Sequence, residues 1–417
     1  LPVNLAATLA LEARVSVSGG TRHTAEHPRT VLLTGGKMTK ALHLARAFHR
    51  AGHRVVLVES GRYRLTGHRF SRAVDAFHVV PAPQDPGYVA AVVAVAEREG
   101  AEVFVPLSSP VSSAYDSQVR EALAGRCDSV HVDPPTLGVV DDKGAFARAA
   151  ADLGLPVPDT HLITDPAQVL DFDFSGARRP YVLKSIAYDP VHRLDLTPLP
   201  WPTRAQTEAF VASLPISAEN PWILQELIAG PEYCTHGTAR DGELTAYCCC
   251  ESSAFQVNYE HVDKPEIERW VRTFVRALGA TGQLSFDFIE TVDGTPYAIE
   301  CNPRTHSAIT LFDDPVALAH AYLDAHTTTL TPPASAPATY WLYHELWRLL
   351  RAPWRVAERW QVLRSGRDAI FDPRDPLPFL LVHHLQVPSL LLGNLLARRD
   401  WLRIDFNIGK LVEPAGD

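Results

Sequence analysis

Two acidic residues and one amide, Asp287, Glu300 and Asn302, could together hold a divalent cation. Residues 284–290 and 297–302 alternate in hydropathy and carry aromatic side chains, so both segments are predicted strands. The two-residue period of a strand places Asn302 on the same face as Glu300. Carboxylate and amide oxygens suit Mg²⁺, which takes few protein ligands and completes its shell with water and phosphate.

The turn between these strands decides which residues face each other. Asp293-Gly294 is a strong hairpin signal, because a type I′ turn needs positive φ at both central residues. If these two residues form the turn, Val292 pairs with Thr295 and Asp287 faces Glu300. Facing carboxylates destabilise a ladder unless a cation neutralises them. The alternative interpretation is a surface hairpin whose acidic side chains point at water.

Two lysines and a second acidic site precede the hairpin. Lys143 lies at the start of a predicted capped helix, and Lys184 ends the short apolar strand 181–184. A buried strand is predicted over 222–228 and is followed by Glu232. A solvated lysine is the alternative explanation for Lys143.

The first third of the chain predicts a parallel sheet. Residues 30–59 read as strand, glycine turn, amphipathic helix and strand, and a helix over 88–99 leads into a strand over 103–106. The turn at 34–37 lacks both the G-x-G-x-x-G fingerprint and the full phosphate-loop spacing. This part of the chain is therefore a weak candidate for binding a nucleotide.

Small residues follow two of these predicted strands. Ligands of parallel sheets bind at the carboxyl ends of the strands, so Gly35, Ser108 and Ser109 are expected to line one crevice that binds a substrate. Ordinary turn chemistry is the alternative for the serines.

Composition limits the class of protein. The chain has 417 residues, 46% hydrophobic and 21% charged, which predicts a globular protein of two to three units. A net charge of −9 argues against a nucleic-acid partner. The run Cys248–Cys250 has no metal-type spacing, so we expect a reduced, cytoplasmic protein.

Residues 1–28 lack the basic region of a signal peptide and are expected to form a flexible tail. No membrane span is predicted, because the longest apolar run, 385–397, is short and contains Pro388.

The order of the polar residues resembles the ATP-grasp family of ATP-dependent ligases. The resemblance is carried, in chain order, by Lys184, Gln225-Glu226-Leu227-Ile228, Glu232, Asp287, Glu300 and Asn302. It implies an α+β, ATP-grasp fold in three parts. These are a Rossmann-like pre-ATP-grasp α/β domain over 29–128, an ATP-grasp domain over 129–330 with subdomains 129–220 and 221–330, and a helical C-terminal extension over 331–417.

The resemblance also implies a role for each residue. Lys143 and Lys184 would neutralise ATP phosphates, and Gln225, Glu226 and Ile228 would border the adenine, with Glu232 on the ribose. Asp287, Glu300 and Asn302 would hold Mg²⁺, with Mn²⁺ as the alternative, and Arg304 would act with Lys184 on the transferred phosphoryl group and the acceptor.

The chain departs from the family at residues 185–193, which contain no glycine where many members have a glycine-rich loop. His192 or Arg193 would supply charge beside the substrate there, and this loop is expected to act as a lid.

A finer resemblance is to the ligases of mycosporine-like amino acid biosynthesis. It is carried by residues 34–59, 67–74, 105–117, 184–196, 375–384 and 401–413. It implies an enzyme that joins glycine to the cyclohexenone 4-deoxygadusol with ATP, giving mycosporine-glycine, ADP and phosphate. The expected partners are these small molecules, and a homodimer is compatible with this function.

Two alternatives remain open. The first is an ATP-grasp ligase that joins a different carboxylate and amine. The second is a non-catalytic ATP-binding or membrane-surface protein, because the tryptophan-rich region after 331 places Arg351, Arg355 and Arg359 four residues apart on one helix face. A solvated face on a helix docked to the ligase core is the preferred interpretation of that row.

Overall fold

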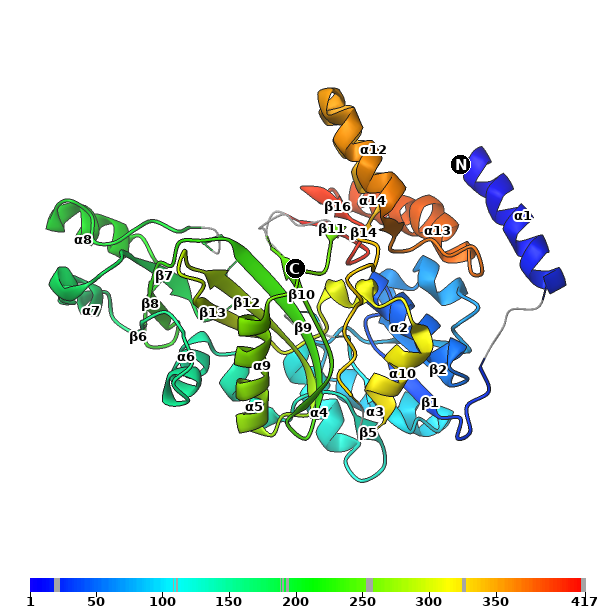
Figure 1. The fold of residues 1–417 in the computed structure, drawn as a ribbon, viewed down its shortest axis with the longest axis horizontal. Helices are drawn as coiled ribbons and strands as arrows, with labels where there is room; N and C mark the ends of the chain where they lie inside the picture. Colours follow the sequence, from blue (N-terminus) through cyan, green and yellow to red (C-terminus); the bar gives the residue numbers. More distant parts are fainter. Residues whose placement is uncertain are drawn as a thin grey trace.

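The computed structural model describes residues 1–18, 23–107, 109, 112–187, 189, 191–192, 195–252, 258–324 and 328–413. Figure 1 shows the N-terminal sheet and its helices at one side, a small lobe with β6, β7 and β8 at the opposite side, and the strands β9 to β13 between them. The mixture of parallel sheet, antiparallel sheets and covering helices confirms the predicted α+β class.

A five-stranded parallel sheet forms the N-terminal region, in the order β3-β2-β1-β4-β5. Its central strands are fully buried, because helices cover both faces. This order confirms the predicted Rossmann-like sheet. Its elements are β1 (Thr30–Leu33), α2 (Thr39–Arg50), β2 (Arg54–Ser60), η1 (Gly61–Tyr63), η2 (Gly67–Phe70), β3 (Ala76–Val80), α3 (Tyr88–Glu99), β4 (Val103–Val105), α4 (Ser113–Ala122) and β5 (Asp128–Ser129).

The expected flexible tail contains a helix. Residues Pro2–Ser18 form α1, which reaches the C-terminal helices through the amide of Asn4, 3.0 Å from both Tyr343 Oη and His384 Nε2. The Leu/Ala-rich composition that favours this helix has no clear amphipathic period, so the sequence did not predict it.

The small lobe contains a three-stranded antiparallel sheet in the order β6-β8-β7. Asp142 caps α6 by accepting a hydrogen bond from Ala145 N at 2.7 Å, and this cap places Lys143 in the first turn. The elements are α5 (Pro134–Val140), α6 (Lys143–Asp152), β6 (Thr160–Ile163), α7 (Pro166–Leu170), η3 (Phe174–Gly176), β7 (Tyr181–Ser185), α8 (Arg204–Ala212) and β8 (Trp222–Glu226).

The central region contains a four-stranded antiparallel sheet in the order β10-β9-β12-β13. Helix α9 covers one face and buries Ile267, Trp270 and Phe274 against the sheet. The elements are β9 (Glu232–Arg240), β10 (Glu243–Glu251), β11 (Asn258–Tyr259), α9 (Pro265–Leu278), β12 (Gly282–Glu290), β13 (Pro296–Asn302), η4 (Ser307–Leu311) and α10 (Pro315–Leu323).

The sequence predicted a helical C-terminal extension, but the structure shows that the extension also contains strands. Its described residues include four short strands, one of which pairs with β11 and two of which form a hairpin of their own. Strands of two or three residues are too short to show a period-two pattern. The elements are β14 (Thr339–Tyr340), α11 (Leu342–Arg351), η5 (Pro353–Arg355), α12 (Val356–Ser365), β15 (Arg367–Asp368), α13 (Leu377–Leu381), η6 (Val382–Gln386), α14 (Val387–Leu396), β16 (Arg403–Asp405) and β17 (Lys410–Val412).

Two features of the extension bear on the membrane question. The predicted arginine row does not lie on one helix, because Arg351 ends α11, Arg355 ends η5 and Arg359 lies in α12, where it pairs with the buried Glu345 at 3.3 Å. Helix α12 projects from the body, and Trp354 and Trp360 are 79% and 64% exposed (Figure 1). The continuous helix Leu377–Leu396 is long and apolar enough to cross a membrane by length and composition alone, with 44% of its most apolar window buried. A core helix meets the same criteria, so this helix does not by itself assign a span.

Candidate functional site

The hairpin of β12 and β13 places Asp287 directly opposite Glu300, as predicted. The predicted turn is wrong, however. Thr291 pairs with Thr295, so the loop has three residues, Val292 to Gly294, and the register near the turn is shifted by one. A β-bulge then shifts the pairing back, because Phe288 pairs with Ala298 while Asp287 pairs with Glu300, which leaves Ile299 as the extra residue.

The amide of Asn302 lies between the two carboxylates. Its Nδ2 donates to Asp287 Oδ2 at 3.2 Å and to Glu300 Oε1 at 3.4 Å. Which amide atom faces the acids is set by the hydrogen-bonding partners, so a bound cation would instead meet the Asn302 oxygen after a flip. Lys143 approaches from α6, with Nζ 3.8 Å from Glu300 Oε2.

The electrostatics of this cluster fit a cation and a polyphosphate. Burial and the adjacent Glu300 charge raise the pKa of Asp287 well above its usual value. Burial also works to raise the pKa of Glu300, but Lys143 and other neighbours hold that pKa below its usual value. Within the described residues no group of three or more His, Cys, Asp or Glu side chains is suited to a metal. Any ion here would therefore use the two carboxylates and Asn302 with non-protein oxygens, a donor set that suits Mg²⁺.

Lys184 and the end of β8 lie close to this cluster. Lys184 Nζ donates to Gln225 Oε1 at 3.0 Å, and burial lowers the pKa of Lys184 while Glu300, Glu232 and Asp287 oppose the shift. Lysines from the small lobe and carboxylates from the central sheet thus meet between the two antiparallel sheets.

The residues expected near adenine and ribose lie on the same border. Glu226 N donates to Asp159 O at 2.8 Å, so only the carbonyl of Glu226 could serve an incoming base edge. Ile228 is 4% exposed and follows β8, and Glu232 is exposed at the start of β9. Arg304 follows β13 and interacts electrostatically with Glu300 and Asp287.

The loop 185–193 is only partly described. His192 Nδ1 lies 2.6 Å from Asp189 Oδ2, and its ring packs edge-on against Trp222 with centroids 5.8 Å apart. His192 therefore lies against Trp222, the first residue of β8, and is not among the residues that line the cavity at the carboxyl ends of the parallel strands. Arg193, and Ser108 of the predicted substrate crevice, lie outside the described residues.

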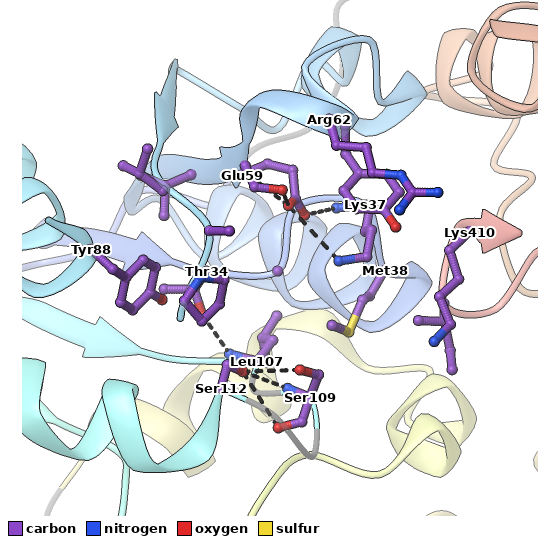
Figure 2. Close-up of a pocket in the computed structure, with 18 of the residues that line it drawn as sticks. Thr34, Lys37, Met38, Glu59, Arg62, Tyr88, Leu107, Ser109, Ser112 and Lys410 are labelled. Atoms are coloured by element: carbon purple, nitrogen blue, oxygen red, sulfur yellow. Dashed lines mark hydrogen bonds and ion pairs between the residues drawn. The ribbon is translucent and has the colours of Figure 1, made fainter. Parts of the chain in front are cut away.

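A cavity of about 250 Å³ lies at the carboxyl ends of β1, β2 and β4 (Figure 2). Gly35 and Ser109 line it, as the sequence predicted. The order β3-β2-β1-β4-β5 reverses direction between β1 and β4, and this switch point is where open α/β sheets bind ligands. Gly35 has φ +66°, and a Cβ there would lie 2.8 Å from Leu107 O, so the residue lets the two strand ends approach each other.

Lys40 contacts the segment that follows the carboxylate cluster, and sequence reasoning missed it. Its Nζ donates to the carbonyl of Thr305, the residue after Arg304, at 2.7 Å. Burial, with the charges of Arg304 and Lys37, lowers the pKa of Lys40 to about 7. Lys40 lies on the buried side of α2, and only a pattern of charged residues inside an apolar helix face could have indicated it.

Comparison with known proteins gives a fold. No family model matches the sequence, and no curated protein matches it. Biotin carboxylase from Campylobacter jejuni, solved as a β-γ-ATP complex, superposes with a TM-score of 0.57 at 15% identity, over 74% of this chain and 74% of that chain. An ADP complex of N5-carboxyaminoimidazole synthetase from Staphylococcus aureus gives 0.54 at 11% identity, over 74% and 81%.

An L-amino acid ligase from Bacillus licheniformis is also similar, with a TM-score of 0.52 at 16% identity, over 72% of this chain and 75% of that chain. Identities this low carry the arrangement of elements and not the activity. The chain therefore has the fold of these ligases, which is the ATP-grasp fold expected from the sequence.

Proposed function

We propose that this protein is an ATP-dependent ligase that forms a carbon–nitrogen bond. The observation that carries the proposal is the facing pair Asp287 and Glu300, bridged by Asn302 and approached by Lys143 at 3.8 Å from Glu300. Two like charges directly opposite each other are costly, so the carboxylates favour a bound cation, and the lysines favour an anionic ligand beside it. The similar structures of biotin carboxylase and N5-carboxyaminoimidazole synthetase are complexes with β-γ-ATP and with ADP, which supports a nucleotide here.

The residues take the following roles in this proposal. Asp287, Glu300 and Asn302 would hold Mg²⁺, which when bound neutralises negative charge on the phosphates. Lys143 and Lys184 bind phosphate oxygens as point charges, while Gln225, Glu226, Ile228 and Glu232 border the adenosine.

The finer proposal is ligation of glycine to 4-deoxygadusol, and it rests on the sequence resemblance. The ring of this substrate contains an enolised 1,3-diketone, and the oxygen of its enolate attacks the γ-phosphorus of ATP as the bond to ADP breaks. Lys184 and Arg304 stabilise the charge on the phosphoryl group in transit. The glycine amine then attacks the activated carbon, the carbon–oxygen bond to phosphate breaks, and the amine loses a proton, giving the enaminone.

Product analysis tests this function. Purified full-length protein with Mg-ATP, glycine and 4-deoxygadusol should release ADP and phosphate and form an ultraviolet-absorbing enaminone. ADP formation only with a different acceptor would overturn the finer proposal and keep the coarser one. Absence of ADP with every acceptor and amine tried would overturn both.

A second candidate is a ligase that joins another carboxylate to an amine, and the similarity to the L-amino acid ligase favours it. A panel of amino acids and small carboxylic acids, scored by phosphate release, distinguishes the two. Turnover with two amino acids and none with the cyclohexenone would select this candidate.

A further inference from the structure

The C-terminal hairpin of β16 and β17 forms one wall of the 250 Å³ cavity, although it lies some 320 residues along the chain from Tyr88 on the opposite wall. Ile408, Lys410, Leu411 and Glu413 all line the cavity. Figure 2 shows Lys410, from β17, on one side of the cavity and Tyr88 on the other. The extension is therefore part of this site and not a separate appendage.

Backbone contacts fix the turn of this hairpin on the start of α2. Thr39 N donates to Asn407 O at 2.9 Å, and Thr39 Oγ1 donates to Phe406 O at 3.2 Å. Gly409 has φ +70°, and a Cβ there would lie 2.1 Å from Lys37 O. Close backbone contact of this kind sets the position of the next residue, Lys410, within narrow limits.

The buried Gln386 holds the same turn from the other side. Its Nε2 donates to Gly409 O at 2.9 Å, and its Oε1 accepts from Gly67 N at 2.9 Å and from Thr66 Oγ1 at 3.1 Å. Helical extension, hairpin and N-terminal sheet are thus joined by one side chain that is 1% exposed.

The charges that line the cavity sum to one positive charge. The cations are Lys37, Arg62 and Lys410, and the anions are Glu59 and Glu413. Lys37 Nζ lies 3.9 Å from Glu59 Oε1, and Arg62 forms an ion pair with Glu413. Lys410 is 8% exposed. A lining in which cations outnumber anions favours an anionic ligand.

The remaining lining suits a small hydroxylated ring. Hydroxyl groups of Thr34, Ser60, Tyr63 and Ser109 line the cavity together with apolar side chains such as Met38 and Leu107. A volume of about 250 Å³ is below the range of drug-sized sites and fits a molecule of about one ring.

We propose that this cavity binds the acceptor as a cyclic mono-anion, the enolate of a 1,3-diketone, with Lys37 and Lys410 facing its negative charge. The inference rests on the proposed function, and it assigns the cyclohexenone site and makes the C-terminal hairpin a determinant of substrate specificity. The cavity lies close to the carboxylate cluster along the chain, because Lys40, three residues after Lys37 and in the first turn of α2, contacts Thr305 beside Arg304.

Binding of two probes to the full-length protein tests the charge requirement without any turnover. Cyclohexane-1,3-dione is an enolate at neutral pH, and 3-methoxycyclohex-2-enone has a similar shape and no charge. Calorimetry should detect the dione and give at least about tenfold weaker binding for the ether, because the uncharged ether loses the charge-assisted hydrogen bonds to the lysines. Equal affinity for both probes, or no binding of the dione, would overturn the assignment.

Substitution locates the site. Lys410→Met should weaken dione binding and raise the KM for the acceptor about 10- to 100-fold, with the KM for ATP unchanged. Lys264→Met is the matched control, because Lys264 pairs with Glu290 at 2.8 Å on a different sheet. Equal effects of the two substitutions would overturn the assignment.

Binding of a fluorescent ATP analogue separates the two proposals. If the protein binds the analogue but not the dione, the acceptor site is wrong and the nucleotide site survives. If it binds the dione but not the analogue, the proposed function is wrong.

Discussion

At the scale of single residues, Asn302 and Lys143 make the facing acids tolerable. Asp287 and Glu300 would repel one another in a ladder, yet Asn302 donates to both and Lys143 lies 3.8 Å from Glu300. These contacts hold the two carboxylates side by side, and binding of a cation requires the Asn302 amide to flip so that its oxygen faces the ion.

Replacing Glu300 should therefore separate metal binding from folding. Glu300→Gln should lower kcat by about 100-fold or more, because one charged group of the phosphoryl site is lost. It should also abolish the rise in Tm caused by Mg²⁺ with nucleotide, and it should leave the far-ultraviolet circular dichroism unchanged. Glu290→Gln, at the end of the neighbouring strand β12 and paired with Lys264, is the control and should retain both signals. Full activity of the Glu300→Gln variant would show that Glu300 is not part of the metal site.

At the scale of elements, the contact between the β16–β17 turn and the start of α2 attaches the C-terminal extension to the N-terminal region. Gly409 and Gly154 both have φ +70°, but only Gly409 has a neighbouring backbone atom where a Cβ would be. The two glycines therefore form a matched pair that separates backbone strain from steric clash.

Alanine substitution at each glycine measures how much the contact between the turn and α2 contributes to the free energy of unfolding. Gly154→Ala should cost about 1–2 kcal/mol of unfolding free energy, from the left-handed conformation alone. Gly409→Ala should cost about 1–3 kcal/mol more, because its Cβ would overlap Lys37 O. Urea unfolding measures both, and equal losses would show that the turn does not press on α2.

At the scale of the whole molecule, several histidines are buried in the neutral form. Burial lowers the pKa of His68, His131 and His383 to about 4, and that of His236 to about 3. The unfolded chain binds these protons near pH 6.5, before the folded protein does. The stabilising contribution is thus complete above pH 6.5 and is lost as the pH falls toward 4.

The free energy of unfolding should consequently decrease between pH 6.5 and pH 5. His131→Gln should reduce that slope by about one proton, or about 1.4 kcal/mol per pH unit, because Gln can still donate to Ser113 O. Urea titrations at several pH values measure the slope, and identical slopes in the variant and the parent protein would contradict the assignment to His131.

The sequence by itself determined the local elements and the chemistry of the acidic hairpin. The helix over 88–99, the strand pairs around Asp287 and Glu300, and the cap before Lys143 follow from periodicity and from residues that interact within a few positions. The pairing of Asp287 with Glu300 was predicted correctly only because two departures from the predicted hairpin cancel each other. The longer turn shifts the pairing by one and the bulge at Ile299 restores it, and neither leaves a signal in a period-two pattern.

Tertiary structure alone decided what surrounds the cavity. The contacts Thr39 to Asn407, Lys40 to Thr305 and Gln386 to Gly409 join segments whose separation in sequence gives no local pattern. Lys410 looks like an ordinary surface lysine in the sequence, and it becomes a cavity residue because Gly409 allows its turn to pack against α2. Residue types therefore predicted the chemistry of each side chain, whereas long-range packing decided which of them share a site.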